Sequence, residues 1–116
     1  MPKATPAASD LLDTVREFME RDLLPVVSGD LRFQCRVAIN VLSIVMRELE
    51  LAPVQREAES HRLALLLGHE ESIDELNREL ARRIREGEMG EETPGLLDHL
   101  RATSVEALRI DNPKWI

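Results

Sequence analysis

The residues with the clearest chemical potential are arginines on one side of a single predicted helix. Arg32, Arg36, Asn40 and Arg47 lie on one stripe of that helix because most of their spacings are close to one turn. Guanidinium groups bind carboxylate and phosphate, so the stripe is a candidate anion-binding or partner-docking site. The alternative is a solvated face on which Arg47 pairs with Glu50. Asn40 borders the apolar side, and we expect it to be buried and to join helices.

A second set of candidates contains histidine. His61 follows Glu57 by four residues, a spacing that suits either a metal site or a base oriented by a carboxylate. A metal would need further ligands, and the paired Glu-x-x-His pattern of di-metal bundles is absent from the sequence. We therefore expect His61 to be a packed or half-exposed side chain, with no metal and no cofactor. His99 lies beside Asp98 and has no visible partner pattern.

Nucleophiles offer little to a catalytic mechanism. Cys35 is the single cysteine and falls on the apolar side of its helix, where a thiol behaves as a small hydrophobic group. No serine lies in a nucleophile elbow, and the five glycines lie at turns or helix ends instead of forming a phosphate loop. The sequence therefore predicts no catalytic residues, and we expect that the protein is not an enzyme.

The C-terminal tail carries the only tryptophan of the chain, Trp115, followed by Ile116. Chain ends are usually polar and loose unless something holds them. Either the tail folds back onto the helices, or Trp115 binds a partner, since tryptophan is enriched at interface hot spots. We expect the tail to fold back, and Trp115 stays a candidate partner-binding residue.

Hydrophobic spacing and cap residues predict helices throughout the chain. Thr5-Pro6 and Thr93-Pro94 are typical of helix starts, Ser72 with Glu75 forms a capping box, and Gly68 suits a helix end. The predicted helices cover residues 6–24, 31–51, 52–67, 73–86 and 94–110. The fold class is therefore all-α, a single compact antiparallel bundle of about five helices. One domain is expected over 1–116, with 1–5 and 114–116 as loose tails.

The pattern of apolar residues also predicts which faces are buried. The helix at 31–51 is apolar around most of its circumference, which predicts a central helix covered on several sides. Apolar residues at helical spacing also predict the buried faces of the last two helices. In the helix at 73–86 the buried residues should be Ile73, Leu76, Leu80 and Ile84. In the helix at 94–110 they should be Leu96, Leu97, Leu100, Ala107 and Leu108.

Composition narrows the class of protein. The chain has 116 residues, 43% of them hydrophobic, and a net charge of −7. An acidic domain of this kind lacks the basic surface that nucleic acids require, and it is a poor match for an anionic membrane. No apolar run is long enough to span a bilayer, and no secretory signal is visible. We expect a cytoplasmic protein.

Short segments across nearly the whole chain carry a resemblance to a known family. They are LRFQCRVAIN at 31–40, RELEL at 47–51, LLLGH at 65–69, ELN at 75–77, LRAT at 100–103 and IDNP at 110–113. Together they resemble a family of short bacterial helical proteins of unknown function. The members of that family are encoded beside, or fused to, phosphotransferases of the aminoglycoside- and choline-kinase type, often near acyl-CoA dehydrogenases. The family supplies no catalytic residues.

The resemblance and the missing catalytic groups together suggest a role. We expect a non-catalytic accessory or protein-interaction domain, and the resemblance implies a phosphotransferase-like enzyme as its partner. Two copies could also pair through an apolar face to form a homodimer. The alternative is a protein that binds a small acyl or CoA-like anion through Arg32, Arg36, Asn40 and Arg47 beside an apolar cleft.

Overall fold

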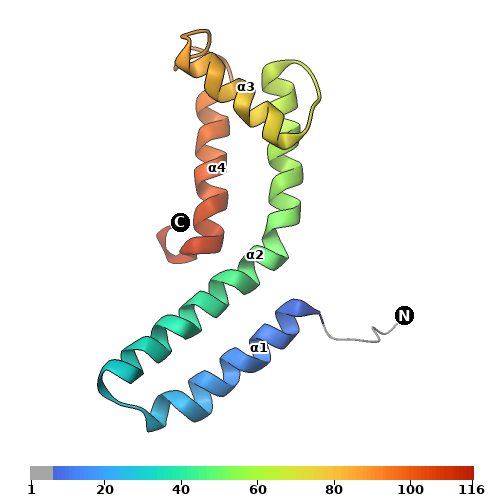
Figure 1. Cartoon of the computed structure of the whole chain (residues 1–116). Helices are drawn as coiled ribbons and strands as arrows, with labels where there is room; N and C mark the ends of the chain where they lie inside the picture. The colour runs from blue at the N-terminus through green and yellow to red at the C-terminus, as the bar shows by residue number, and fades with distance from the viewer. Residues whose placement is uncertain (1–6) are drawn as a thin grey trace. The chain divides into compact units, whose positions relative to one another are not determined.

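The computed structural model describes residues 7–116, and these residues form helices and turns without a strand. The α-helices are α1 (Ala8–Phe18), α2 (Gly29–Leu67), α3 (Ile73–Arg85) and α4 (Leu96–Asp111) (Figure 1). The all-α class is thus confirmed, but the described residues contain four α-helices, so the prediction of about five is wrong. The predicted cap at Thr5-Pro6 lies outside the described residues.

The helix count differs because α2 continues through Pro53. A proline removes one backbone donor and disfavours the helical conformation at the residue before it, so the sequence predicted a new helix there. The contacts nevertheless divide the chain into two compact units at this point, Met1–Leu51 and Ala52–Ile116. Helix α2 therefore contributes to both units. The prediction of one domain over 1–116 stays a prediction.

The first unit is an antiparallel helical hairpin formed by α1 and the part of α2 up to Leu51 (Figure 1). After α1 the chain passes through a π-helical turn, Met19–Leu23, and a 3₁₀ turn, Leu24–Val26. Pro25 lies within that last turn, which ends the helical run close to the predicted position. Gly29 then begins α2 with a φ of 61°, a left-handed conformation that favours glycine.

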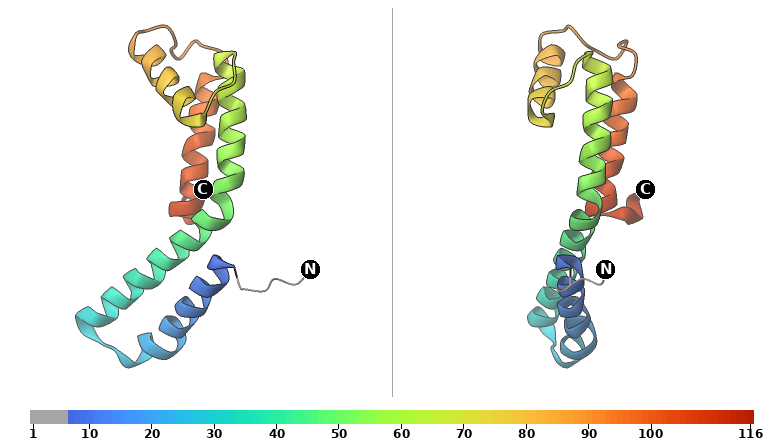
Figure 2. Two further views of the ribbon diagram at one scale, coloured as in Figure 1. Left: turned by 45° about the vertical axis from the view of Figure 1, so that its right-hand side comes forward. Right: turned by 90° about the vertical axis from the view of Figure 1, so that its right-hand side faces the viewer.

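The second unit places the rest of α2 antiparallel to α4, with α3 packed across them (Figure 2). Its core consists of leucines from all three helices and a methionine from the loop after α3: Leu63, Leu67, Leu76, Leu80, Met89 and Leu96. The loop between α3 and α4 is therefore anchored by a buried side chain. Of the predicted buried positions, Ile84, Leu97 and Leu100 are 40–52% exposed and Ala107 is exposed as well, so those four predictions are wrong.

Two helix starts show how local hydrogen bonds fix the boundaries. Ser72 Oγ accepts from the Glu75 N–H at 3.3 Å, which confirms the predicted cap of α3. The second half of the capping box is not formed, because the Ser72 N–H donates to Glu71 at 3.2 Å. Helix α4 starts at Leu96 and not at Pro94, since Thr93 uses its hydroxyl to accept from Gly90 N–H at 2.9 Å.

Candidate functional sites

The predicted arginine stripe lies in the first unit, and its members have different environments. Arg32 is half-buried and donates from Nη1 to the Leu24 carbonyl at 2.6 Å, at the start of the 3₁₀ turn. Arg36 and Asn40 are exposed, so the expectation of a buried Asn40 joining two helices is wrong. Arg47 is half-buried. A ligand-binding role for these four residues stays a prediction.

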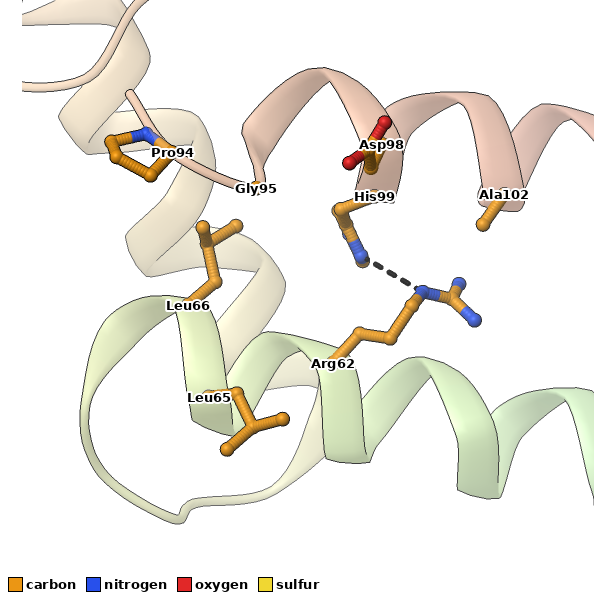
Figure 3. A pocket seen from close by; sticks show the side chains of 8 residues that line it. All are labelled: Arg62, Leu65, Leu66, Pro94, Gly95, Asp98, His99 and Ala102. Atoms are coloured by element: carbon orange, nitrogen blue, oxygen red, sulfur yellow. Dashed lines mark hydrogen bonds between the residues drawn. The ribbon is translucent and has the colours of Figure 1, made fainter. Parts of the chain in front are cut away.

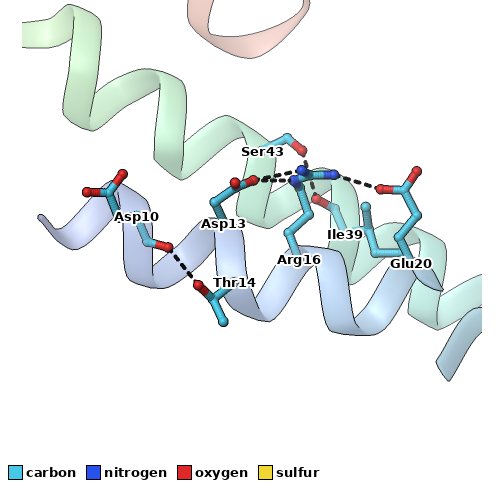
Figure 4. Close-up of polar contacts among 7 residues, drawn as sticks. All are labelled: Asp10, Asp13, Thr14, Arg16, Glu20, Ile39 and Ser43. Atoms are coloured by element: carbon cyan, nitrogen blue, oxygen red, sulfur yellow. Dashed lines mark hydrogen bonds and ion pairs between the residues drawn. The ribbon is translucent and has the colours of Figure 1, made fainter. Parts of the chain in front are cut away.

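An ion-paired arginine lies on α1 of this unit. Arg16 makes 2.7 Å ion pairs with both Asp13 and Glu20 on its own helix (Figure 4). The hydrogen bonds that Arg16 donates to Asp13 raise the pKa of Arg16, so the guanidinium stays charged. Its charge is paired within α1.

The apolar residues of the first unit are less covered than the sequence predicted. Only Cys35 of the 31–51 segment is buried, with its thiol 3.9 Å from the Met19 carbonyl. Apolar side chains on other sides of that segment are 37–66% exposed, among them Phe33, Val41 and Val45. The prediction of a helix covered on several sides is therefore wrong for this structure. The single helix α1 covers only one of its faces.

Six exposed apolar residues of the hairpin lie on one side of it, whereas Phe33, 66% exposed, lies with the polar residues on the other side. Leu11, Val15 and Phe18 of α1 lie roughly 120° around the helix from the residues that pack on α2, at 100° per residue. On α2, Cys35 marks the side that packs on α1. Val37, Val41 and Val45 lie about the same angle around the helix from Cys35, in the same direction of rotation when each helix is viewed from its N-terminus. Because the helices are antiparallel, equal rotations bring both sets to the same side. We call these six residues the hairpin face.

The other side of the hairpin is polar. A rotation of similar size in the opposite sense places Asp13, Glu17 and Glu20 of α1 there, together with Arg36 and Arg47 of α2. The hairpin is therefore amphipathic as a whole, with charge on one side and the hairpin face on the other.

The second unit holds a polar cluster between α2 and α4. Arg62 donates from Nη2 to Glu106 at 2.8 Å and to Thr103 Oγ1 at 3.3 Å, and from Nε to His99 Nδ1 at 3.2 Å. Gln55 adds a 3.0 Å hydrogen bond to the Glu106 carbonyl. These contacts join two helices whose residues lie far apart in the sequence.

His99 is the most deeply placed polar residue of this cluster, with 4% of its surface exposed. Burial lowers its pKa, and the neighbouring Arg62 charge lowers it further, against the opposing effect of Glu59 and Glu106. The ring is therefore neutral at pH 7, and Nδ1, which accepts from Arg62, leaves the ring proton on Nε2. A ring this buried, whose Nδ1 already has a partner, fits a structural role better than that of a general base.

Sequence reasoning missed this cluster because its members lie on two helices. A usable signal was present: His99, Thr103 and Glu106 are spaced i, i+4, i+7, which places three polar side chains on one helix face. Such a stripe requires a donor from a facing helix, and Arg62 supplies it. The facing residue itself follows only from the fold.

A pocket of about 480 Å³ adjoins the cluster on the second unit (Figure 3). Leu65, Leu66, Pro94 and Ala102 supply most of its apolar wall, and Arg62 and His99 lie at its polar end. This volume lies in the range of small-ligand sites. The Arg62 charge is already paired with Glu106, so the pocket offers apolar surface more than free positive charge.

The remaining predicted candidates are near the surface. His61 is exposed and lines a hollow with Glu57, Glu70 and Glu71. Among residues 7–116 no group of three or more His, Cys, Asp or Glu side chains is arranged to hold a metal ion. Trp115 is 77% exposed, so the expectation that it folds back onto the helices is not met. The predicted loose tail is instead a 3₁₀ turn, Pro113–Trp115.

An exposed charged network ties α3 to the end of α2. His69 lies 2.6 Å from Glu79, and Arg83 pairs with the other oxygen of Glu79 at 2.7 Å. The hydrogen bond from His69 lowers the pKa of Glu79, with Arg83 adding to the effect, so the carboxylate stays ionised. This network joins α3 to the turn after α2, and within it Arg83 Nε is buried without a hydrogen-bond partner among the described residues.

Within the part of the chain that the structure describes, no helix has the length and apolar character needed to cross a bilayer. The described residues thus form an all-helical protein with an amphipathic hairpin in the first unit and a largely apolar pocket in the second. The family model for DUF6285, a domain of unknown function, matches residues 25–115, and the chain belongs to this family. The match covers α2 to the C-terminal turn and leaves out α1. No curated protein and no solved structure matches the chain.

Proposed function

We propose that this protein is a non-catalytic interaction domain that is accessory to another protein. It binds that protein through the hairpin face. The observation that carries the proposal is the exposure of six apolar side chains, 37–55% each, on one side of the hairpin. Soluble proteins rarely expose a contiguous apolar surface of this kind unless it binds something. The polar cluster in the second unit is internally satisfied, which suits an architectural role.

The resemblance noted in the sequence extends the proposal to a partner. Proteins of this kind are encoded beside or fused to aminoglycoside- and choline-kinase-like phosphotransferases, so a phosphotransferase-like enzyme is the partner we propose. The bacterial cytoplasm is where the two would meet. The exposed Trp115 offers a second apolar contact for such an enzyme.

The test is capture of partners by the tagged full-length protein from its own cells, quantified by mass spectrometry. Val41→Asp places a charge in the hairpin face, and Asn40→Asp, one residue away on the polar side, adds the same charge outside it. We expect a phosphotransferase-like enzyme with the wild type and with Asn40→Asp, and at least tenfold less with Val41→Asp. Equal capture by all three proteins would overturn the proposal.

A second candidate function has its own supporting observation. The 480 Å³ pocket beside Arg62 supports small-molecule binding in the second unit, whereas the sequence placed that activity on the arginine stripe. An acyl chain suits the apolar wall formed by Leu65, Leu66 and Ala102.

Octanoyl-CoA is a suitable probe of this second candidate, read as a rise in the melting temperature. Ala102→Phe fills the pocket, and Arg36→Ala removes one charge from the stripe. Loss of the rise in Ala102→Phe alone would support the pocket, and loss in Arg36→Ala alone would support the stripe. No rise in the wild type at millimolar probe would exclude binding of this ligand class.

A further inference from the structure

The hairpin face groups six partly exposed apolar side chains on one side of two paired helices. Domains are built from packed layers, and two antiparallel helices alone form a single layer with little interior. Among the described residues of the first unit, Cys35 is the one buried apolar residue, with 6% of its surface exposed. A second layer of helices laid on the hairpin face would complete a core.

We propose that the second layer is the hairpin of another copy of this chain, so that two hairpins form a four-helix bundle. This inference rests on the proposed function because it uses the same surface, but it gives that surface a second copy as its occupant. The second copy and a phosphotransferase-like enzyme exclude each other on these six residues. A four-helix bundle needs antiparallel helix pairs with matching apolar faces, and the chain itself carries such a pair. In an isologous contact the same surface of each copy faces the other, so the assembly is complete with two copies.

The available area is close to what a stable pair needs. Five of the six residues are smaller than an aromatic residue, so about 150 Å² each, the lower end of the aromatic range, is the appropriate scale; their exposed fractions then amount to about 435 Å² of apolar surface per hairpin. Interfaces are about 60% apolar, so this corresponds to roughly 725 Å² per copy. A stable interface of standard size buries about 800 Å² on each partner.

The uncharged middle of the hairpin face suits contact with the same face of a second copy. Between Val37 and Val45 the α2 side chains on this side carry no charge, so two faces meet without burying unpaired ions. An apolar hollow of about 230 Å³ lies close to the hairpin turn, lined by residues that include Leu23, Leu31 and Cys35. Such a hollow can receive a side chain from the facing hairpin, as in bundle packing.

Charged residues mark the ends of this surface. By the same rotation, Asp22 and Asp30 lie on this side near the turn, and Glu48 lies on it near the open end of the hairpin. The acids limit the apolar contact to the middle of the hairpin and remain in contact with water at its rim. The net charge of −7 per chain then lies mainly outside the contact.

Sedimentation equilibrium of the purified full-length protein tests the proposal. We expect twice the chain mass of 13.2 kDa for the wild type and for Asn40→Asp at about 50 μM. Val41→Asp and Val15→Asp, one on each helix of the face, should both sediment as monomers. Circular dichroism of each variant establishes that the helices are retained.

A fluorescent dye that binds apolar surface separates this proposal from the proposed function. A wild-type monomer that binds the dye, with binding lost in Val41→Asp, would refute pairing between copies and leave the face open for a different protein. A monomer that binds no dye would refute both proposals, since the face would not be exposed in solution. A dimer that persists in Val41→Asp and Val15→Asp would refute the assignment of the contact to this face.

Discussion

The contact between Arg62 and Glu106 should be the strongest polar link between α2 and α4. Their side chains are 25% and 16% exposed, and two hydrogen bonds of 2.8 and 3.3 Å join them. Arg62→Met keeps the length of the side chain but removes the charge and leaves His99 Nδ1 without its donor. Glu106→Gln removes the opposite charge.

The magnitude follows from this partial burial. Breaking a fully buried ion pair costs about 3–5 kcal/mol, while an exposed pair contributes about 0.2–1 kcal/mol. The Arg62 cluster lies between these limits, so we expect Arg62→Met to lower the free energy of unfolding by about 2–3 kcal/mol. The coupling energy with Glu106→Gln should be about 1–2 kcal/mol, because each substitution removes the same interaction.

A double-mutant cycle in urea, followed by circular dichroism, measures this coupling. The matched control is the Arg16–Glu20 pair, which has the same kind of contact at 2.7 Å but a Glu20 side chain that is 57% exposed. Its coupling energy should be below about 0.5 kcal/mol. Equal coupling in the two cycles would refute the argument that burial makes the Arg62 contact stronger.

Three further predictions follow from the environments of single residues. Burial lowers the pKa of His99, so on acidification the unfolded chain binds a proton at this residue before the folded chain does. The free energy of unfolding should therefore fall as the pH decreases below about 6.5, by at most ~1.4 kcal/mol per pH unit. Urea unfolding of His99→Gln should show a smaller dependence on pH. Leu63→Ala should cost about 3 kcal/mol because Leu63 is 0% exposed, whereas Leu65→Ala, at 73% exposed, should change thermal stability by less than about 0.5 kcal/mol. Trp115→Ala should likewise leave unfolding within about 0.5 kcal/mol, and a larger loss would show that the tail is packed in solution.

Much of the secondary structure could be predicted because its signals are local. The Ser72 cap and the end of α2 at Gly68, with a φ of 86°, depend on residues within one turn of each other. Pro53 misled the prediction, because the same residue fits a helix start and an interruption inside a helix. Thr93 misled it as well, since its hydroxyl bonds Gly90 instead of capping α4.

The candidate sites could be predicted less well because they depend on which helices meet. Three arginines on one stripe are visible in the sequence, but the use of Arg32 to bind the Leu24 carbonyl depends on the turn between α1 and α2. The Arg62–His99 contact spans 37 residues, so it requires the antiparallel pairing of α2 with α4. The sequence shows which side chains can form hydrogen bonds, but the identity of each partner depends on which helices pack together.

The misjudged helix at 31–51 leads to the proposed assembly. An apolar circumference predicts that a helix is covered, but it does not say which chain covers it. In the first unit α1 can occupy only one side of that helix, and Val37, Val41 and Val45 remain exposed. If the sequence pattern is correct, the missing cover must come from outside the hairpin. The error in the fold prediction and the inferred contact between two copies therefore have the same origin, and Val41→Asp tests both.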